Sequence, residues 1–151
     1  MPAARLALIG PLVRARRLLP VLAVAGLAVP ATAGATVGPT APGPVVDSNV
    51  PGRAQSYRVT SSATEPVDTL SIYVDGSSTI STSSRVELGL FAGATSGPRS
   101  RLARCVITAV LPDAWNRCGF APASVSKGAT YWTVVLQPYG SGGTVRYRNS
   151  T

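Results

Sequence analysis

Carboxylates are the first residues to consider for acid–base chemistry, because the 151-residue sequence contains no histidine. A Ser-His-Asp triad is therefore excluded. The six acidic residues lie in different predicted elements, mostly beside turn residues, where Asp is favoured because its carboxylate hydrogen-bonds the nearby backbone. They are Asp47, Glu65, Asp68, Asp75, Glu87 and Asp113. No pair is marked for general acid–base work, so we predict no catalytic residue and no enzyme.

Cys105 and Cys118 are the only two cysteines. If the chain is exported, as the features of residues 1–35 described below predict, an even count favours one disulfide over two free thiols. A hairpin around the segment "LPDA" would bring the two residues opposite each other in consecutive strands. Two thiolates without histidine do not complete a zinc site, so we predict neither a metal nor a cofactor.

Aromatic side chains are better candidates for ligand contacts, since flat rings can stack on sugars while Arg and Asn supply hydrogen bonds. Trp132 shares its predicted strand face with Val134 and Leu136, which indicates a place in the core. Trp115 and Tyr139 instead lie at predicted turns, where proteins often place binding residues. The tentative ligand-binding set is Trp115, Asn116, Tyr139 and Arg146.

The elements that would position these residues are short strands. Beyond residue 53, runs of Val, Ile, Leu, Tyr and Thr alternate with polar residues and are bounded by Gly, Pro, Ser or Asp. In residues 70–74 and 86–90 every second side chain is apolar, which is typical of half-buried antiparallel strands. The pattern predicts an all-β fold, an antiparallel β-sandwich of the jelly-roll type, over residues 53–151. Residues 129–148 are expected to form a hairpin with Val145 and Tyr147 on its packed side.

Residues 1–35 have the features of a secretory signal peptide, predicted to be helical. Four arginines without an acid precede an apolar run and the small-residue ending "ATAGA". The apolar run is shorter than the roughly 20 residues that a membrane span needs, so a retained anchor is the less favoured alternative. Cleavage after Ala33 and after Ala35 both fit, and the Arg16-Arg17 pair leaves the general and twin-arginine export routes open. We expect a secreted, extracellular protein that touches a membrane only while the signal peptide is uncleaved.

Residues 36–52 are rich in Pro and Gly and are expected to form a linker or an extended N-terminal arm. The segment "VVDSNV" within them could pair at a sheet edge.

The formal charge of +8 falls to +4 once the signal peptide is removed, because ten basic and six acidic residues remain. That value is ordinary for a small soluble domain, whereas nucleic-acid binding calls for a clustered basic stripe. Alternation predicts that Arg99 and Arg101 share one strand face and that Arg104 takes the other, which splits the nearest cluster. We therefore expect no nucleic-acid partner, and the sequence indicates no oligomeric state.

Several segments in order resemble small β-sandwich accessory modules of secreted bacterial proteins, which occur beside glycosidases, peptidases and cell-surface repeats and are in part domains of unknown function. The most specific elements are "AWN", "GATYW" and "RYR", and the similarity spans most of residues 57–148. The motif residues are Trp115, Asn116, Gly128, Tyr131, Trp132, Arg146 and Tyr147. The resemblance implies a jelly-roll-like fold and attachment to carbohydrate or cell wall.

Three functional hypotheses follow from these observations. The leading one is a secreted, non-catalytic module that binds a polysaccharide or the cell envelope weakly, through loops around Trp115 and Tyr139. A structural or adhesive module without a small ligand is the second. A small carboxylate-dependent hydrolase is the third.

Overall fold

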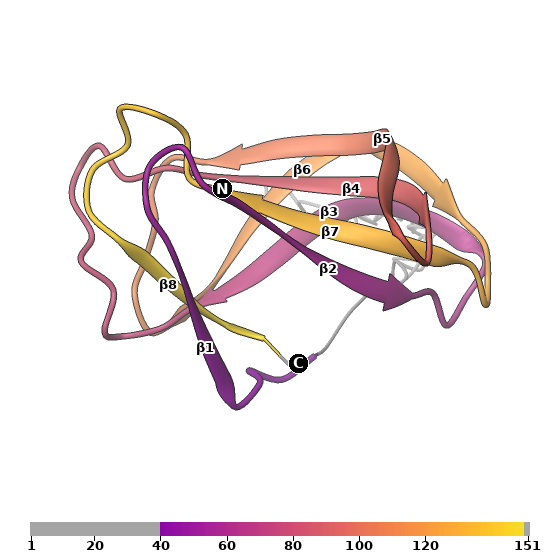
Figure 1. Cartoon of the computed structure of the whole chain (residues 1–151), viewed down its shortest axis with the longest axis horizontal. Coiled ribbons are helices and arrows are strands. Elements are labelled where there is room, and N and C mark those ends of the chain that lie inside the picture. Colours follow the sequence, from indigo (N-terminus) through magenta and orange to yellow (C-terminus); the bar gives the residue numbers. More distant parts are fainter. Residues whose placement is uncertain (1–39, 150–151) are drawn as a thin grey trace, which may run out of the picture. The chain divides into compact units, whose positions relative to one another are not determined.

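The computed structural model describes residues 40–149, in which every regular element is a β-strand (Figure 1). The predicted signal peptide lies outside the described residues. Residues 40–149 contain no helix that is long and apolar enough to cross a membrane. In chain order the strands are β1 (Val45–Asn49), β2 (Ala54–Thr60), β3 (Glu65–Val74), β4 (Val86–Ala94), β5 (Gly97–Ile107), β6 (Ala114–Val125), β7 (Thr130–Leu136) and β8 (Val145–Asn149).

The strands form two four-stranded antiparallel sheets, with orders β1-β8-β3-β6 (sheet A) and β2-β7-β4-β5 (sheet B). Strands pair in a nested way, first with last and so on inward, until β4 and β5 meet in a hairpin. This nesting is the jelly-roll arrangement, in which the two sheets pack face to face. The predicted fold class is therefore confirmed.

The core consists of the facing sides of the two sheets. The alternating residues expected to point inward from β3, β4 and β8 are all buried, which confirms the period-two interpretation. The buried apolar residues are Val67, Leu70, Ile72, Val74, Val86, Leu88, Leu90, Ala103, Cys105, Ile107, Val110, Val125, Tyr131, Val135, Val145 and Tyr147.

Two predicted hairpins are wrong. Because β5 lies in sheet B and β6 in sheet A, the connection around "LPDA" crosses from one sheet to the other. The same holds for residues 129–148, where β7 and β8 belong to opposite sheets. In residues 45–149 only the β4–β5 connection joins two strands of one sheet. The alternation of apolar and polar residues predicts which side chains of a strand are buried. It does not predict which other strand pairs with that strand.

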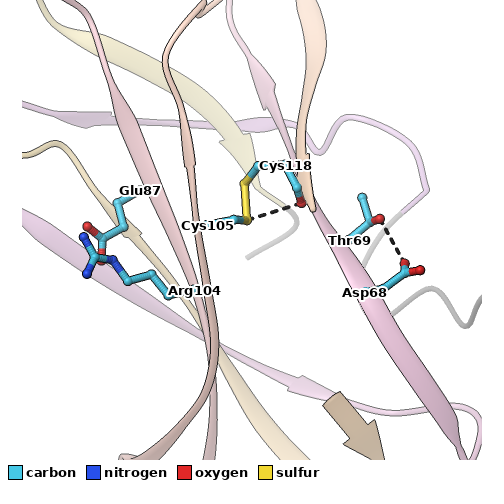
Figure 2. The surroundings of a disulfide bond; sticks show 6 residues. All are labelled: Asp68, Thr69, Glu87, Arg104, Cys105 and Cys118. Carbon is cyan, nitrogen blue, oxygen red and sulfur yellow. Dashed lines mark hydrogen bonds and ion pairs between the residues drawn. A yellow bond between two sulfur atoms is a disulfide. The ribbon is translucent and has the colours of Figure 1, made fainter. Parts of the chain in front are cut away.

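The cysteine pair is nevertheless joined as predicted. Cys105 on β5 and Cys118 on β6 form a disulfide with their Cα atoms 5.7 Å apart. Figure 2 shows the bond on one side of β5, with Glu87 and Arg104 pointing to the other side. Since β5 and β6 are edge strands of different sheets, the disulfide closes one side of the sandwich covalently.

Trp132 does not lie in the core, which corrects the prediction. The buried residues of β7 are Tyr131 and Val135, which belong to the alternate positions that exclude Trp132. Trp132 lies half-buried on the outer face of sheet B, where its indole Nε1 donates a hydrogen bond to the Ala94 carbonyl at 2.9 Å. Alternate residues on both faces of β7 are apolar, so composition alone favoured the wrong face.

The segment before residue 53 contributes a strand. Residues Val45–Asn49, one of the two alternatives considered for this region, pair with β8 along the edge of sheet A. In Figure 1 the purple β1 and the yellow β8 lie side by side. The sandwich therefore includes part of the Pro/Gly-rich region.

A polar cluster lies between the sheets near the edge formed by β1 and β2. The Tyr57 hydroxyl donates to the Asp47 carboxylate at 2.6 Å and lies 2.7 Å from the Tyr147 hydroxyl. Gln55 Oε1 accepts from Tyr147, and the Asn149 side-chain amide donates to Asp47. Burial, together with the hydrogen bond to Asp47, raises the pKa of Tyr57 to about 12. Burial likewise raises the pKa of Tyr147.

These raised pKa values predict that the domain loses stability in alkali. In the unfolded chain the pKa of Tyr57 has its ordinary value of 10.0, whereas in the folded domain its pKa is about 12. The stabilising contribution is thus complete below pH 10.0 and is lost as the pH rises toward 12. Urea unfolding of wild type and Tyr57→Phe across this window should show the steeper decline in wild type. Parallel declines would contradict the prediction.

Removing the disulfide should destabilise the domain. For a cross-link between residues 13 apart, the chain-entropy model gives about 3 kcal/mol. The double variant Cys105→Ala/Cys118→Ala should lower the free energy of unfolding by that amount in urea titrations. Reduced wild type serves as the control and should match the variant. A difference below about 0.5 kcal/mol would show that the bond does not constrain the unfolded chain.

Candidate functional site

Trp115 lies on the outer face of sheet A within a group of side chains from three strands and two loops. It is paired in register with Tyr73, and the two rings meet edge to face with centroids 5.7 Å apart. The Tyr73 hydroxyl donates to the Asp113 carboxylate at 2.7 Å. We call the surface formed by Tyr73, Asp75, Asp113, Trp115 and Arg148 the Trp115 patch.

Local backbone geometry explains how Asp113 reaches Tyr73. Asp113 ends the β5–β6 connection with φ 53°, the left-handed conformation that Asp tolerates better than most residues. The β3–β4 loop meets this turn at Gly76, where an added methyl carbon would lie 3.5 Å from the Asp113 Cβ. The crossing connection and the loop thus bring a carboxylate beside two rings that are distant in sequence.

Asp75 and Arg148 form the ionic part of the patch. The Arg148 Nε lies 2.7 Å from Asp75 Oδ2, and the other carboxylate oxygen accepts hydrogen bonds from the hydroxyl and backbone N–H of Ser77, at 2.6 and 2.9 Å. The hydrogen bonds from Ser77, assisted by Arg148, lower the pKa of Asp75. The hydrogen bond to Asp113 raises the pKa of Tyr73. At neutral pH the patch therefore presents an ionised carboxylate, an arginine and a neutral phenol.

Arg146, a predicted site residue, lies beside the patch. It is exposed, its Nη1 donates to the Ser77 hydroxyl at 3.5 Å, and its backbone N–H donates to Ser78 Oγ at 2.9 Å. Ser77 therefore contacts both Arg146 and Asp75 and links this arginine to the Trp115 patch.

Asn116, also predicted as a site residue, is buried with 5% of its surface exposed. Its carbonyl accepts from the Leu111 N–H at 2.8 Å, and its amide donates to the carbonyls of Leu111 and Ala114 at 2.8 and 3.0 Å. The side chain thus holds the β5–β6 connection in shape and offers no surface to a ligand. Its contribution is to fix the turn that carries Asp113.

Tyr139 is separate from the Trp115 patch. It is 87% exposed in the β7–β8 loop, and its ring lies against Gly52 of the β1–β2 loop, where an added methyl carbon would clash at 2.4 Å. Within residues 40–149 no hydrogen bond or ring contact joins Tyr139 to Trp115. The two predicted aromatic contacts therefore belong to different surfaces.

Two further observations bear on the chemistry of residues 40–149. No group of three or more acidic or cysteine side chains in this range could hold a metal ion. A hollow of about 510 Å³ lies between the β3–β4 and β5–β6 loops, lined by residues 80–82 and 108–111. Its lining is aliphatic and hydroxylic and carries no charge, so it offers little to orient a ligand.

Sequence reasoning missed Tyr73, Asp75, Asp113 and Arg148 as site residues. Alternation did place Tyr73 on an outer face, and Asp113 was recognised only as a turn residue. No local signal connects these positions, because β3, β6 and β8 become neighbours only through the nested pairing of sheet A.

The lowered pKa of Asp75 makes the patch sensitive to acid. Its carboxylate stabilises the folded state above the ordinary pKa of 3.8, and this contribution is lost as the pH falls below that value. Between neutral pH and about pH 3, the urea midpoint should fall more for wild type than for Asp75→Asn. Asp68→Asn, an exposed change on β3, is the matched control and should follow wild type. If Asp75→Asn also follows wild type, the ion pair is not stabilising.

Comparisons of this chain with protein-family models, with curated proteins and with solved structures find no match. The resemblance to secreted accessory modules therefore stays an expectation based on the motif residues.

Proposed function

We propose that this protein is a secreted, non-catalytic module that binds a polysaccharide or a glycan of the cell envelope through the Trp115 patch. The observation that carries the proposal is the combination of an indole ring with a phenol, a carboxylate and an arginine on one sheet face. A sugar ring has apolar C–H faces and a rim of hydroxyls. The indole would contact the face, while Asp113 and Arg148 would exchange hydrogen bonds with the rim.

A binding role fits the charges of the patch better than catalysis. A general acid needs a carboxyl group that is still protonated near neutral pH. The lowered pKa of Asp75 leaves this carboxyl ionised there. Asp75 thus acts in the proposal as a hydrogen-bond acceptor.

Export is part of the same proposal. The signal-like residues 1–35 support it, and so does the disulfide, because such bonds persist in oxidising compartments.

A structural or adhesive module is the second candidate. It is favoured by the internal pairing of the patch, since Tyr73 already engages Asp113 and Asp75 already engages Arg148. A ligand would have to add contacts to these groups or compete for them. Binding is accordingly expected to be weak.

The test is retention of the folded protein on insoluble glycans such as cellulose, chitin and peptidoglycan. Trp115→Ala should reduce retention about five- to thirtyfold, because loss of an aromatic anchor typically costs roughly 1 to 2 kcal/mol. Trp115→Phe should keep part of it, since a flat apolar ring remains. Melting curves of the three proteins confirm that each is folded.

Tyr139→Ala is the matched control, because it removes an exposed ring from a different surface and should leave retention unchanged. Loss of retention only in Tyr139→Ala would move the site to the β7–β8 loop. Absence of retention for wild type on every glycan would instead support the structural module.

A further inference from the structure

Four residues form a continuous row across the outer face of sheet B. Arg58 on β2 is paired in register with Trp132 on β7, Trp132 with Phe91 on β4, and Phe91 with Arg101 on β5. Residues directly opposite each other in a sheet project from the same face. The row thus places two aromatic rings between two arginines, whose Cα atoms are about 14 Å apart at the usual strand spacing.

A β-bulge makes this row possible. The register shifts between Leu90 and Phe91, so that Leu90 opposes Ala103 while Phe91 opposes Arg101. The extra residue in β5 restores Arg101 to the face that also carries Arg104. The expectation that Arg104 lies opposite Arg101 is therefore wrong, since strict alternation does not hold across a bulge.

Glycines hold the two rings close to the sheet. An added methyl carbon on Gly89 would lie 2.7 Å from the Phe91 ring, and one on Gly93 would lie 2.6 Å from the Trp132 ring. Both rings are half-buried, while Arg58 and Arg101 are exposed. The row is therefore a flat aromatic surface, close to the sheet backbone, with an arginine at each end; we call the two rings the aromatic floor.

Charge is distributed unequally between the sheets. The strands of sheet B carry four arginines and one acid, Glu87, whereas those of sheet A carry three arginines and three acids. Figure 2 shows the Glu87 and Arg104 side chains next to each other. The Arg104 Nε lies 2.7 Å from Glu87 Oε1, so Glu87 is engaged by an arginine outside the row and does not neutralise the arginines of the row. The outer face of sheet B is thus complementary to a negatively charged partner.

We propose that this row binds an anionic polysaccharide, a chain of sugars that carries carboxylate groups. Guanidinium groups pair bidentately with carboxylates, and the aromatic floor between them would contact the sugar rings. The disulfide is consistent with a compartment in which such chains are found. This surface lies on the opposite sheet from the Trp115 patch and does not depend on the function proposed for that patch.

The experiment measures binding of the full folded protein to sodium polygalacturonate by affinity electrophoresis, with neutral dextran as the uncharged comparison. Wild type should be retarded by polygalacturonate and not by dextran, and retardation should weaken as salt rises. Arg58→Gln/Arg101→Gln should weaken binding at least about tenfold, because two charge-assisted contacts are lost.

The matched control is Arg117→Gln/Lys127→Gln, which removes the same charge from exposed positions outside sheet B and should bind like wild type. Equal weakening in both double variants would overturn the proposal, since net charge alone would then explain binding. So would tighter binding of wild type to a single-stranded oligothymidylate than to polygalacturonate, or no binding to polygalacturonate. If the row variant does not fold, Arg101→Gln is compared with Arg117→Gln under the same criteria.

Discussion

The packing of the two apolar sheet faces against each other is the constraint on which the other features depend. Once Leu88, Leu90 and Val135 of sheet B face Ile72, Val74 and Val145 of sheet A, the outward position of every neighbouring side chain is determined. Tyr73 and Trp115 lie outside because Val74 and Ile72 lie inside. The outward orientation of the side chains in both candidate binding surfaces thus follows from the packing of the core.

Alternation predicted the strands, their buried residues and the sandwich, because a period of two is a local property of the chain. It failed for Trp132, where both faces of β7 are apolar, and for Arg101 and Arg104, where a bulge adds one residue to β5. It also does not show which strands pair with each other. Two connections that cross between the sheets were therefore predicted as hairpins. The cysteine prediction succeeded because a disulfide requires only that the two residues lie close together with their Cβ atoms facing each other, whichever connection produces this arrangement.

The candidate site was less predictable than the fold. Trp115 and Arg146 could be chosen from residue type and position, but their partners come from β3, β8 and the β3–β4 loop. Asn116 has the residue type of a sugar ligand, and only its burial and its three turn hydrogen bonds assign it a structural task. Whether such a residue binds a ligand or supports the fold depends on which distant strands pair with its own strand. Residue types and their spacing along the chain do not reveal that pairing.

The pairing of β1 with β8 has a mechanical consequence. Val45 lies opposite Asn149, so the outermost residues of the two strands are neighbours. Tension applied between Val45 and Asn149 would break the hydrogen bonds of the β1–β8 ladder one residue pair at a time. The hydrogen bonds would not share the force. Peeling requires little force, whereas the covalent link between β5 and β6 lies on the far edges of both sheets and cannot share the load. The β1–β8 ladder is therefore poorly suited to carry tension applied between Val45 and Asn149.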